Sequence, residues 1–271
     1  MDAPTARAAL EWLVEAGADE ALAEAPIDRF ALPDKAEWQE AAQARRAAEK
    51  PFKAPAKAAP KPARADGPVD PAEAVDAAEA AAAAAGTLDA LKAAIGAYPH
   101  CDLKKSARNV VFSDGLAGAH LMVIGEAPGR DEDIEGKPFV GRSGKLLDKM
   151  AAAIGLSRRA EDPAEGLYIT NVMPWRPPGN RDPEALEIAM MRPFLLRHIE
   201  LAKPKAIAVM GNPACAALLG KRGITKLRGN WETVGDVPAM PTFHPAYLLR
   251  NPIKKRESWA DLLAIEDRLR G

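Results

Sequence analysis

The sequence contains little cysteine. Its 271 residues include two, Cys101 and Cys215, and neither lies in a CxxC pair. This number alone excludes a four-cysteine zinc or iron–sulfur site within one chain. The two thiols could form one disulfide, but the N-terminus lacks the basic and apolar segments of a secretion signal. We therefore expect free thiols and a cytoplasmic protein.

Long apolar runs and an excess of charge of one sign are also missing. No run of about eighteen apolar residues occurs, so we expect no membrane span. The 37 basic residues nearly balance the 38 acidic ones, so a nucleic-acid surface would have to be a local patch. Neither the GxxxxGK[ST] pattern nor the GxGxxG pattern is present, which gives a nucleotide cofactor little support.

Composition divides the chain into three parts. Residues 5–16 have helical apolar spacing, and we expect a helical appendage over residues 1–49. Residues 50–64, KPFKAPAKAAPKPAR, have the composition of a semi-rigid linker, whose charge could alternatively hold the chain near nucleic acid. Residues 70–85 are rich in alanine and helical by propensity, without a strong apolar face. We expect the linker and this alanine-rich helix together to span residues 50–86.

From residue 87 to residue 271, strand-like and helix-like segments alternate. The strand-like segments are 110–112, 121–124, 167–172, 205–210 and 239–243, and the helix-like segments are 87–96, 145–154, 183–201, 212–219 and 253–269. This alternation predicts an α/β fold, a three-layer αβα sandwich with a central, mostly parallel four-stranded sheet. Ligands of such sheets bind beyond the carboxyl ends of the strands. The loops at these ends are 125–144, 173–181, 211–213 and 244–251.

Three residues in these loops are candidates for ligand contact. Phe139 is either a core aromatic or a platform on which a flat ligand stacks. Asn171 ends the strand YITN and is either a turn residue or an amide that reads the edge of a pyrimidine, because it offers a donor and an acceptor side by side. His244 follows a short strand and is either structural or functional.

Candidate DNA contacts flank the same loops. They are Arg142, Ser143 and Lys145 in GRSGK, Arg176 and Arg181 in RPPGNR, and Leu248 and Arg250 after the histidine. The helix start at GRSGK could bind phosphate or simply be solvated. An aromatic ring, an edge-reading amide, a histidine, phosphate contacts and an apolar wedge on one face are what an enzyme needs to take a base out of the DNA stack.

Five motifs in order carry a family resemblance. They are GEAPG (125–129), GKPFVG (136–141), YITNV (168–172), RPPGNR (176–181) and HPAYLL (244–249). Through them the chain resembles the uracil-DNA glycosylase superfamily, and within it family 4, the thermostable bacterial and archaeal type. The resemblance implies a monofunctional glycosylase of base-excision repair, which flips uracil out of DNA and hydrolyses its N-glycosidic bond to leave an abasic site.

The resemblance also implies the roles of single residues. Phe139 would stack on the flipped uracil, and Asn171 would pair with its N3–H and O4. His244 would donate to O2 as the bond breaks, an interaction that stabilises the departing anion. Leu248 would be the intercalating side chain.

The position of the attacking water is less well defined. Glu126 and Glu132 would lie near the sugar and this water. Ala127 would contact uracil, and it stands where the best-known family has a water-activating aspartate. We therefore take Glu132 as the substitute for that aspartate.

The resemblance breaks down at the metal site. Family 4 enzymes hold a [4Fe–4S] cluster with four cysteines, and the corresponding positions here are Tyr98, Cys101, Trp175 and Met191. One cysteine is kept, so we expect no cluster and no other cofactor, with the three large side chains filling the space by packing.

The relatives that trap DNA covalently use a histidine in the loop after the YITN-like strand. Residues 173–183, MPWRPPGNRDP, contain none, so we expect turnover.

Two other functions stay open. The lost cluster and Ala127 make a non-catalytic or slow-turnover binder of uracil-containing or abasic DNA conceivable. Residues 1–86 could also tether the chain to repair or replication partners. We expect a monomer that acts on single- or double-stranded DNA and does not bind membranes.

Overall fold

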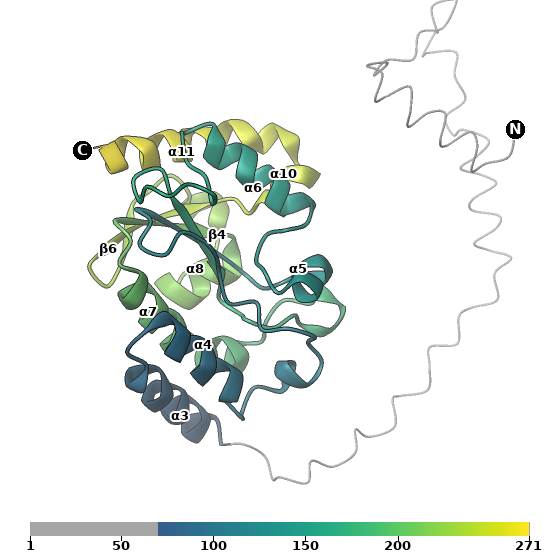
Figure 1. The fold of residues 1–271 in the computed structure, drawn as a ribbon. Coiled ribbons are helices and arrows are strands. Elements are labelled where there is room, and N and C mark those ends of the chain that lie inside the picture. The colour runs from purple at the N-terminus through teal and green to yellow at the C-terminus, as the bar shows by residue number, and fades with distance from the viewer. Residues whose placement is uncertain (1–69, 271) are drawn as a thin grey trace, which may run out of the picture. The chain divides into compact units, whose positions relative to one another are not determined.

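The computed structural model describes residues 70–270. These form three layers, a six-stranded sheet between two layers of helices (Figure 1). The strands are β1 (Asp114–Gly115), β2 (Leu121–Gly125), β3 (Leu167–Asn171), β4 (Ala206–Met210), β5 (Glu232–Val234) and β6 (Val237–Thr242). Their order is β1-β3-β2-β4-β6-β5. The expectations for residues 1–49 and 50–69 lie outside the described residues.

The α/β sandwich expected from the sequence is confirmed, with a larger sheet. The central strands β3, β2, β4 and β6 run parallel, as predicted. Two short strands, β1 and β5, add antiparallel edges to these four. The sequence did not reveal the edges, because two or three residues are too few to show an alternating pattern.

Helices cover both faces of the sheet. They are α3 (Pro71–Ala84), α4 (Leu88–Ala97), α5 (Arg130–Glu135), α6 (Arg142–Ala152), α7 (Ala185–Ala202), α8 (Asn212–Leu219), α9 (Ile224–Leu227), α10 (Pro245–Arg250) and α11 (Lys255–Arg270), with single 3-10 turns η1 (Asp102–Lys105), η2 (Pro178–Asn180) and η3 (Pro252–Lys254). In Figure 1, α6, α10 and α11 lie on one side of the sheet, and α3, α4, α7 and α8 lie on the other. No helix in the described residues is long and apolar enough to cross a membrane.

The side chains of β2 alternate between two apolar clusters, as those of a strand buried on both faces must. Leu121 and Val123 join the cluster that includes Leu147 of α6. Met122 and Ile124 join the opposite cluster, beneath α7. The two faces of β2 are thus both buried, which fixes its register and the position at which the chain leaves the sheet.

The strand expected at residues 110–112 is absent. The segment is extended, but its backbone bonds go elsewhere: the Val111 N–H donates to the Pro174 carbonyl at 2.8 Å. The Phe112 carbonyl accepts from the Thr170 hydroxyl at 2.7 Å. Side-chain and loop partners therefore replace the ladder that the apolar, β-branched composition predicted.

The alanine-rich helix α3 packs against α7 and is part of the folded unit. Ala74, Ala78 and Ala82 line its buried face. The Tyr98 hydroxyl donates to the Ala74 carbonyl at 2.6 Å. The helical propensity of residues 70–85 is confirmed. The small side chains form a close-packing face that has little hydrophobicity, and this face joins the helix to the folded unit.

Both cysteines are buried and free, as expected from the sequence.

The packing of α3 leads to a stability test. Ala78 is fully buried, so Ala78→Leu should overpack the α3–α7 contact and lower the free energy of unfolding by about 1–3 kcal/mol. Ala80→Leu, on the exposed side of the same helix, should change it by less than about 0.5 kcal/mol. Urea unfolding measures both, and equal effects would contradict a tight α3–α7 contact.

Candidate active site

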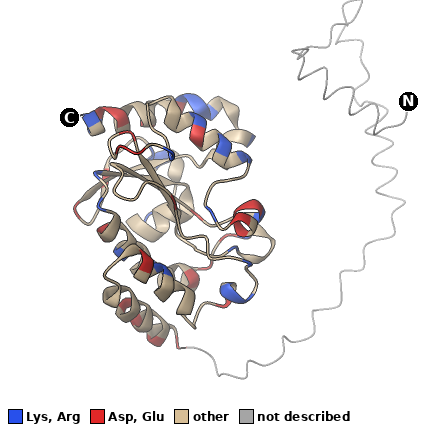
Figure 2. Ribbon diagram, in the orientation of Figure 1, with Lys and Arg blue, Asp and Glu red and all other residues tan. Residues whose placement is uncertain are grey.

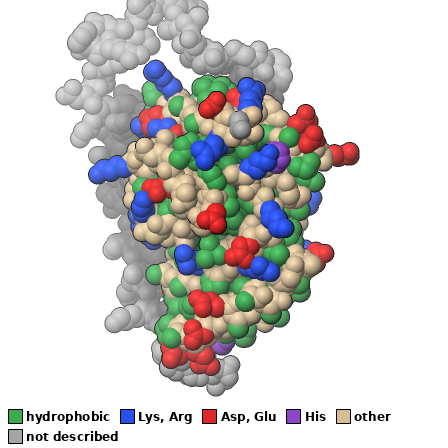
Figure 3. All heavy atoms as spheres, turned by 90° about the vertical axis from the view of Figure 1, so that its left-hand side faces the viewer, with side chains coloured by type: hydrophobic (Ala, Val, Ile, Leu, Met, Phe, Trp, Pro, Cys, Tyr) green, Lys and Arg blue, Asp and Glu red, His purple; other side chains and the backbone are tan. Residues whose placement is uncertain are grey.

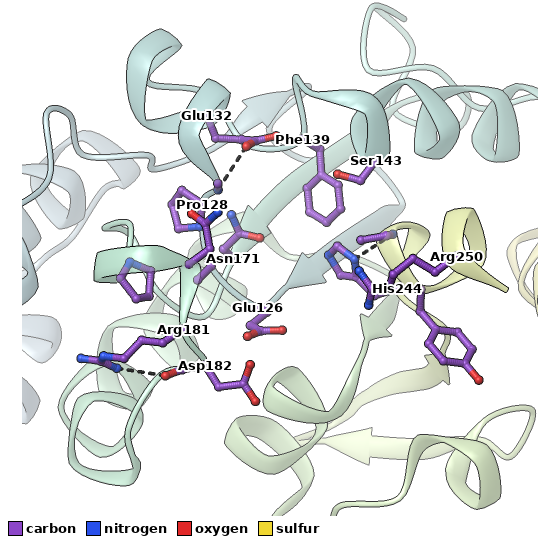
Figure 4. A pocket seen from close by; sticks show the side chains of 16 residues that line it. Glu126, Pro128, Glu132, Phe139, Ser143, Asn171, Arg181, Asp182, His244 and Arg250 are labelled. Atoms are coloured by element: carbon purple, nitrogen blue, oxygen red, sulfur yellow. Dashed lines mark hydrogen bonds between the residues drawn. The ribbon is translucent and has the colours of Figure 1, made fainter. Parts of the chain in front are cut away.

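A pocket of about 440 Å³ opens at the carboxyl ends of the parallel strands (Figure 4). Loops after β2, β3 and β6 form its walls, because parallel strands deliver their ends to one edge of the sheet. Nine of the residues predicted from the sequence line it: Glu126, Ala127, Glu132, Phe139, Ser143, Asn171, Arg181, His244 and Arg250. We call this cavity the strand-end pocket.

Gly125, the last residue of β2, allows Phe139 and Asn171 to meet. A Cβ on Gly125 would lie 2.4 Å from Asn171 Oδ1 and 2.6 Å from the Phe139 ring. Both side chains are nearly buried, and the Phe139 ring centroid lies 5.2 Å from that of His244. The ring, the amide and the imidazole therefore gather over the glycine at the strand end.

His244 is held as a neutral hydrogen-bond donor. Its Nδ1 accepts from the Ala246 N–H at 3.1 Å, so the ring proton of the neutral form lies on Nε2. Burial, with a smaller contribution from Arg250, lowers the pKa of His244 to about 4. At neutral pH the ring can therefore donate one hydrogen bond without carrying a charge.

Glu126 lies beside Asp182 in the pocket (Figure 4). Burial, with smaller contributions from the charge and the hydrogen bond of Asp182, raises the pKa of Glu126 to about 7. Sequence reasoning missed Asp182, since an acid in a loop is ordinarily solvated. Glu126 thus changes its charge near neutral pH.

Glu132 is a correction to the role expected from the sequence. Its Oε2 accepts from the Gly129 N–H at 3.1 Å, and its Oε1 accepts from the N–H groups of Val140 and Gly141, both at 3.0 Å. The side chain is nearly buried. A carboxylate that holds three backbone donors joins two parts of a loop, so it is a poor candidate for moving the proton of a water.

Leu248 is also a correction. We expected it to intercalate, but it is 1% exposed and faces the core from α10. Its neighbour Leu249 is 38% exposed and lines a hollow of about 420 Å³ beside the strand-end pocket. Adjacent residues of a helix point about 100° apart, so Leu249 and not Leu248 is exposed beside the pocket.

Two of the predicted cations lie beside the pocket. Arg142 and Arg250 line the neighbouring hollow together with Ser143, and they are joined by Arg130, which the sequence analysis did not single out. In Figure 2, basic residues lie along α6 and α10, whereas acidic residues gather on α5. On the face of the molecule in Figure 3, charges of both signs are interspersed. The basic patch is therefore local.

The other predicted cations are arranged differently. Lys145 lines a separate hollow behind Phe139. The Arg176 Nε donates to Asn180 Oδ1 at 2.7 Å, and Arg181 forms an ion pair with Glu187 at 2.6 Å. Both arginines thus hold the loop after β3, and the structure does not bring Lys145 to the pocket.

The four positions that correspond to cluster ligands do not fit an iron–sulfur cluster. Tyr98, Cys101, Trp175 and Met191 are all buried in one apolar cluster of side chains. They offer a single thiol, and burial raises the pKa of Cys101 to about 11, against the thiolate that iron requires. In the described part of the chain, no group of three or more His, Cys, Asp or Glu side chains could hold a metal ion.

Comparison with known proteins agrees with the motifs. A family model described as "Uracil DNA glycosylase superfamily" matches residues 112–263. The chain is 39% identical over 192 residues to the type-4 uracil-DNA glycosylase of Saccharolobus solfataricus, covering 67% of this chain and 86% of that one. It is 42% identical over 154 residues to the type-4 enzyme of Thermotoga maritima, covering 56% and 77%. The type-4 enzyme of Archaeoglobus fulgidus is 37% identical over 188 residues, covering 66% and 92%.

The contact of Glu126 with Asp182 leads to a titration test. Asp182→Asn removes the negative charge, so the pKa of Glu126 should fall from about 7 while burial keeps it above its ordinary value. Carbon NMR titration, with Glu126→Gln to assign the signal, measures the shift. The exposed Asp131→Asn serves as the control. An unchanged pKa in Asp182→Asn would show that the two carboxyl groups do not interact.

Proposed function

The chain belongs to the uracil-DNA glycosylase superfamily, and from this premise we propose that it removes uracil from DNA by hydrolysis of the N-glycosidic bond. The observation that carries the proposal is the meeting of Phe139, Asn171 and His244 over Gly125. Identity of 39% to a type-4 enzyme over 86% of its length supports the same activity. The product is an abasic site, which enters base-excision repair.

Uracil is selected by the Asn171 amide. Its nitrogen donates to uracil O4 while its oxygen accepts from N3–H, and Phe139 stacks on the ring. Cytosine presents a donor at the position of O4 and an acceptor at N3, so both hydrogen bonds would be mismatched. A base in a duplex reaches these groups after it is flipped out of the stack.

The bond breaks with its electron pair moving to N1 of the base. The negative charge that develops is shared with O2, and His244 Nε2–H donates to this oxygen, an interaction that contributes about 3 kcal/mol. A neutral donor suits this task, because it stabilises the anion without protonating it beforehand. Uracil leaves as an anion and takes a proton from solvent.

The sugar becomes cationic at C1′ as the base departs. The carboxylate of Glu126 stabilises this cation and orients the attacking water, whose oxygen bonds to C1′ and whose proton passes to Glu126. Because the pKa of Glu126 is about 7, its charged form is lost as pH falls through that value. We therefore transfer to Glu126 the role that the sequence analysis gave to Glu132.

The reaction proceeds without an iron–sulfur cluster and without a covalent enzyme–DNA intermediate. Tyr98, Trp175 and Met191 fill their part of the core by packing and supply no thiolate. Among the described residues that line the strand-end pocket, there is no lysine or cysteine to attack C1′. The absence of these nucleophiles supports a monofunctional glycosylase, and we propose that it acts on DNA as a monomer.

A base-release assay tests the proposal. The wild-type protein should release uracil from a single-stranded oligonucleotide, detected by alkaline cleavage at the abasic site. His244→Ala should lower the single-turnover rate by about 100- to 1000-fold, since it removes the donor to the anion. His120→Ala, before β2, should leave the rate unchanged.

The same assay separates an enzyme from a binder. A non-catalytic binder of uracil-containing or abasic DNA would retard such DNA in a gel and release no base. That outcome, or unchanged release by the double variant His244→Ala, Asn171→Ala, would contradict the proposed function.

Leu249 is the residue that we expect to enter the duplex. Leu249→Ala should reduce the rate of uracil release from a duplex by about tenfold and leave release from a single strand unchanged. Only in a duplex does the flipped base leave a gap in the base stack that a side chain can fill. Leu263→Ala, equally exposed on α11, is the matched control. Equal losses on both substrates would argue against a wedge.

A further inference from the structure

Phe139 has a backbone conformation that needs support. Its φ is +54°, in the left-handed region that residues other than glycine rarely adopt. Its side chain carries the stacking surface of the pocket, so the direction of the ring depends on this unusual backbone. Left-handed residues at functional sites persist where surrounding groups fix them.

Glu132 holds the backbone that follows Phe139. Its Oε1 accepts from the N–H groups of Val140 and Gly141, both at 3.0 Å. The same carboxylate reaches back to the Gly129 N–H. The peptide groups after the ring are therefore fixed by a negative charge.

Arg158 holds the backbone on the other side. Its Nη1 donates to the Pro138 carbonyl at 3.1 Å, and its Nη2 donates to the Phe139 carbonyl at 3.0 Å. The guanidinium is held in turn by Asp114 Oδ2 at 3.0 Å and by Asp148 Oδ1 at 2.8 Å. Its side chain is only 12% exposed, in the loop between α6 and β3.

Gly144 completes the surroundings of the Phe139 carbonyl. A Cβ at Gly144 would lie 1.8 Å from that oxygen, so helix α6 presses its backbone against it. The carbonyl is thus enclosed between Gly144 and the Arg158 fork. Movement of Phe139 would break these contacts.

We propose that Arg158 is a positioning residue for the stacking of the flipped base, and that with Glu132 it clamps the Phe139 backbone by opposite charges. This inference rests on the proposed function and adds a residue that lies behind the pocket wall and does not line it. Arginine suits the task because its planar fork donates to two carbonyls and two carboxylates at once. A lysine ammonium has neither the reach nor the geometry.

The clamp is present without DNA, but it should affect binding only when a base stacks on Phe139, and this separates its role from general stability. DNA with a non-cleavable 2′-fluorinated deoxyuridine presents a base to Phe139, and DNA with a tetrahydrofuran abasic analogue presents none. Arg158→Ala should weaken binding of the first by roughly tenfold or more, because a displacement of about 1 Å is costly at such sites. Binding of the second should stay within about twofold.

Two variants guard against misfolding and against a simple charge effect. Arg158→Lys keeps the charge and should retain the fold, yet it should weaken binding of the fluorinated DNA nearly as much as Arg158→Ala. Arg159→Ala removes the exposed neighbouring arginine and should change neither affinity. Equal weakening on both DNAs, or full binding by Arg158→Lys, would overturn the clamp.

A double-mutant cycle in the base-release assay tests the route through Phe139. Arg158→Ala should lower the rate of uracil release roughly tenfold or more in the wild-type background and less than about threefold in the Phe139→Ala background. The effects of two residues that act through one contact are not additive. Equal losses of rate in both backgrounds would overturn the inference about Arg158, whereas the proposed function would still stand because the wild-type protein releases uracil. A wild-type protein that released no uracil would overturn the proposed function and this inference together.

Discussion

The pocket depends on a close approach that only glycine permits at residue 125. A Cβ there would fall 2.4 Å from Asn171 Oδ1 and 2.6 Å from the Phe139 ring, closer than real Cβ contacts allow. The parallel sheet fixes where β2 and β3 end, and the missing side chain lets the groups at those ends meet. The pairing amide and the stacking ring are therefore set by the backbone before any DNA arrives.

The charge states of His244 and Glu126 differ, and this difference suits them to different parts of the proposed reaction. Burial keeps His244 neutral, with a pKa of about 4, and raises the pKa of Glu126 to about 7. His244 thus offers an uncharged donor to a departing anion, and Glu126 offers a carboxylate to a cationic sugar. Partly buried groups act more strongly on a developing charge than groups in water do, and fixed groups need little rearrangement as the bond breaks.

Much of this site could be predicted from the sequence, because strand ends converge wherever a parallel sheet forms. Asn171 ends β3, Phe139 follows β2 and His244 follows β6, and their motifs identified all three. The structure gives Glu132 and Leu248 surroundings that do not suit their expected roles, for physical reasons. The backbone donors around Glu132 exist only after the loop has folded, and the phase of a helix six residues long is not set by its motif. The packing of α3 was missed because alanine contributes shape more than hydrophobicity.

The central claim is that this pocket excises uracil without an iron–sulfur cluster. Tyr98, Cys101, Trp175 and Met191 are packed as core residues, and the strand-end pocket is formed by other segments of the chain. The most direct test measures uracil release and iron content on one preparation of the full chain. The account predicts uracil release by protein that contains no stoichiometric iron. Activity that rises and falls with bound iron would contradict it.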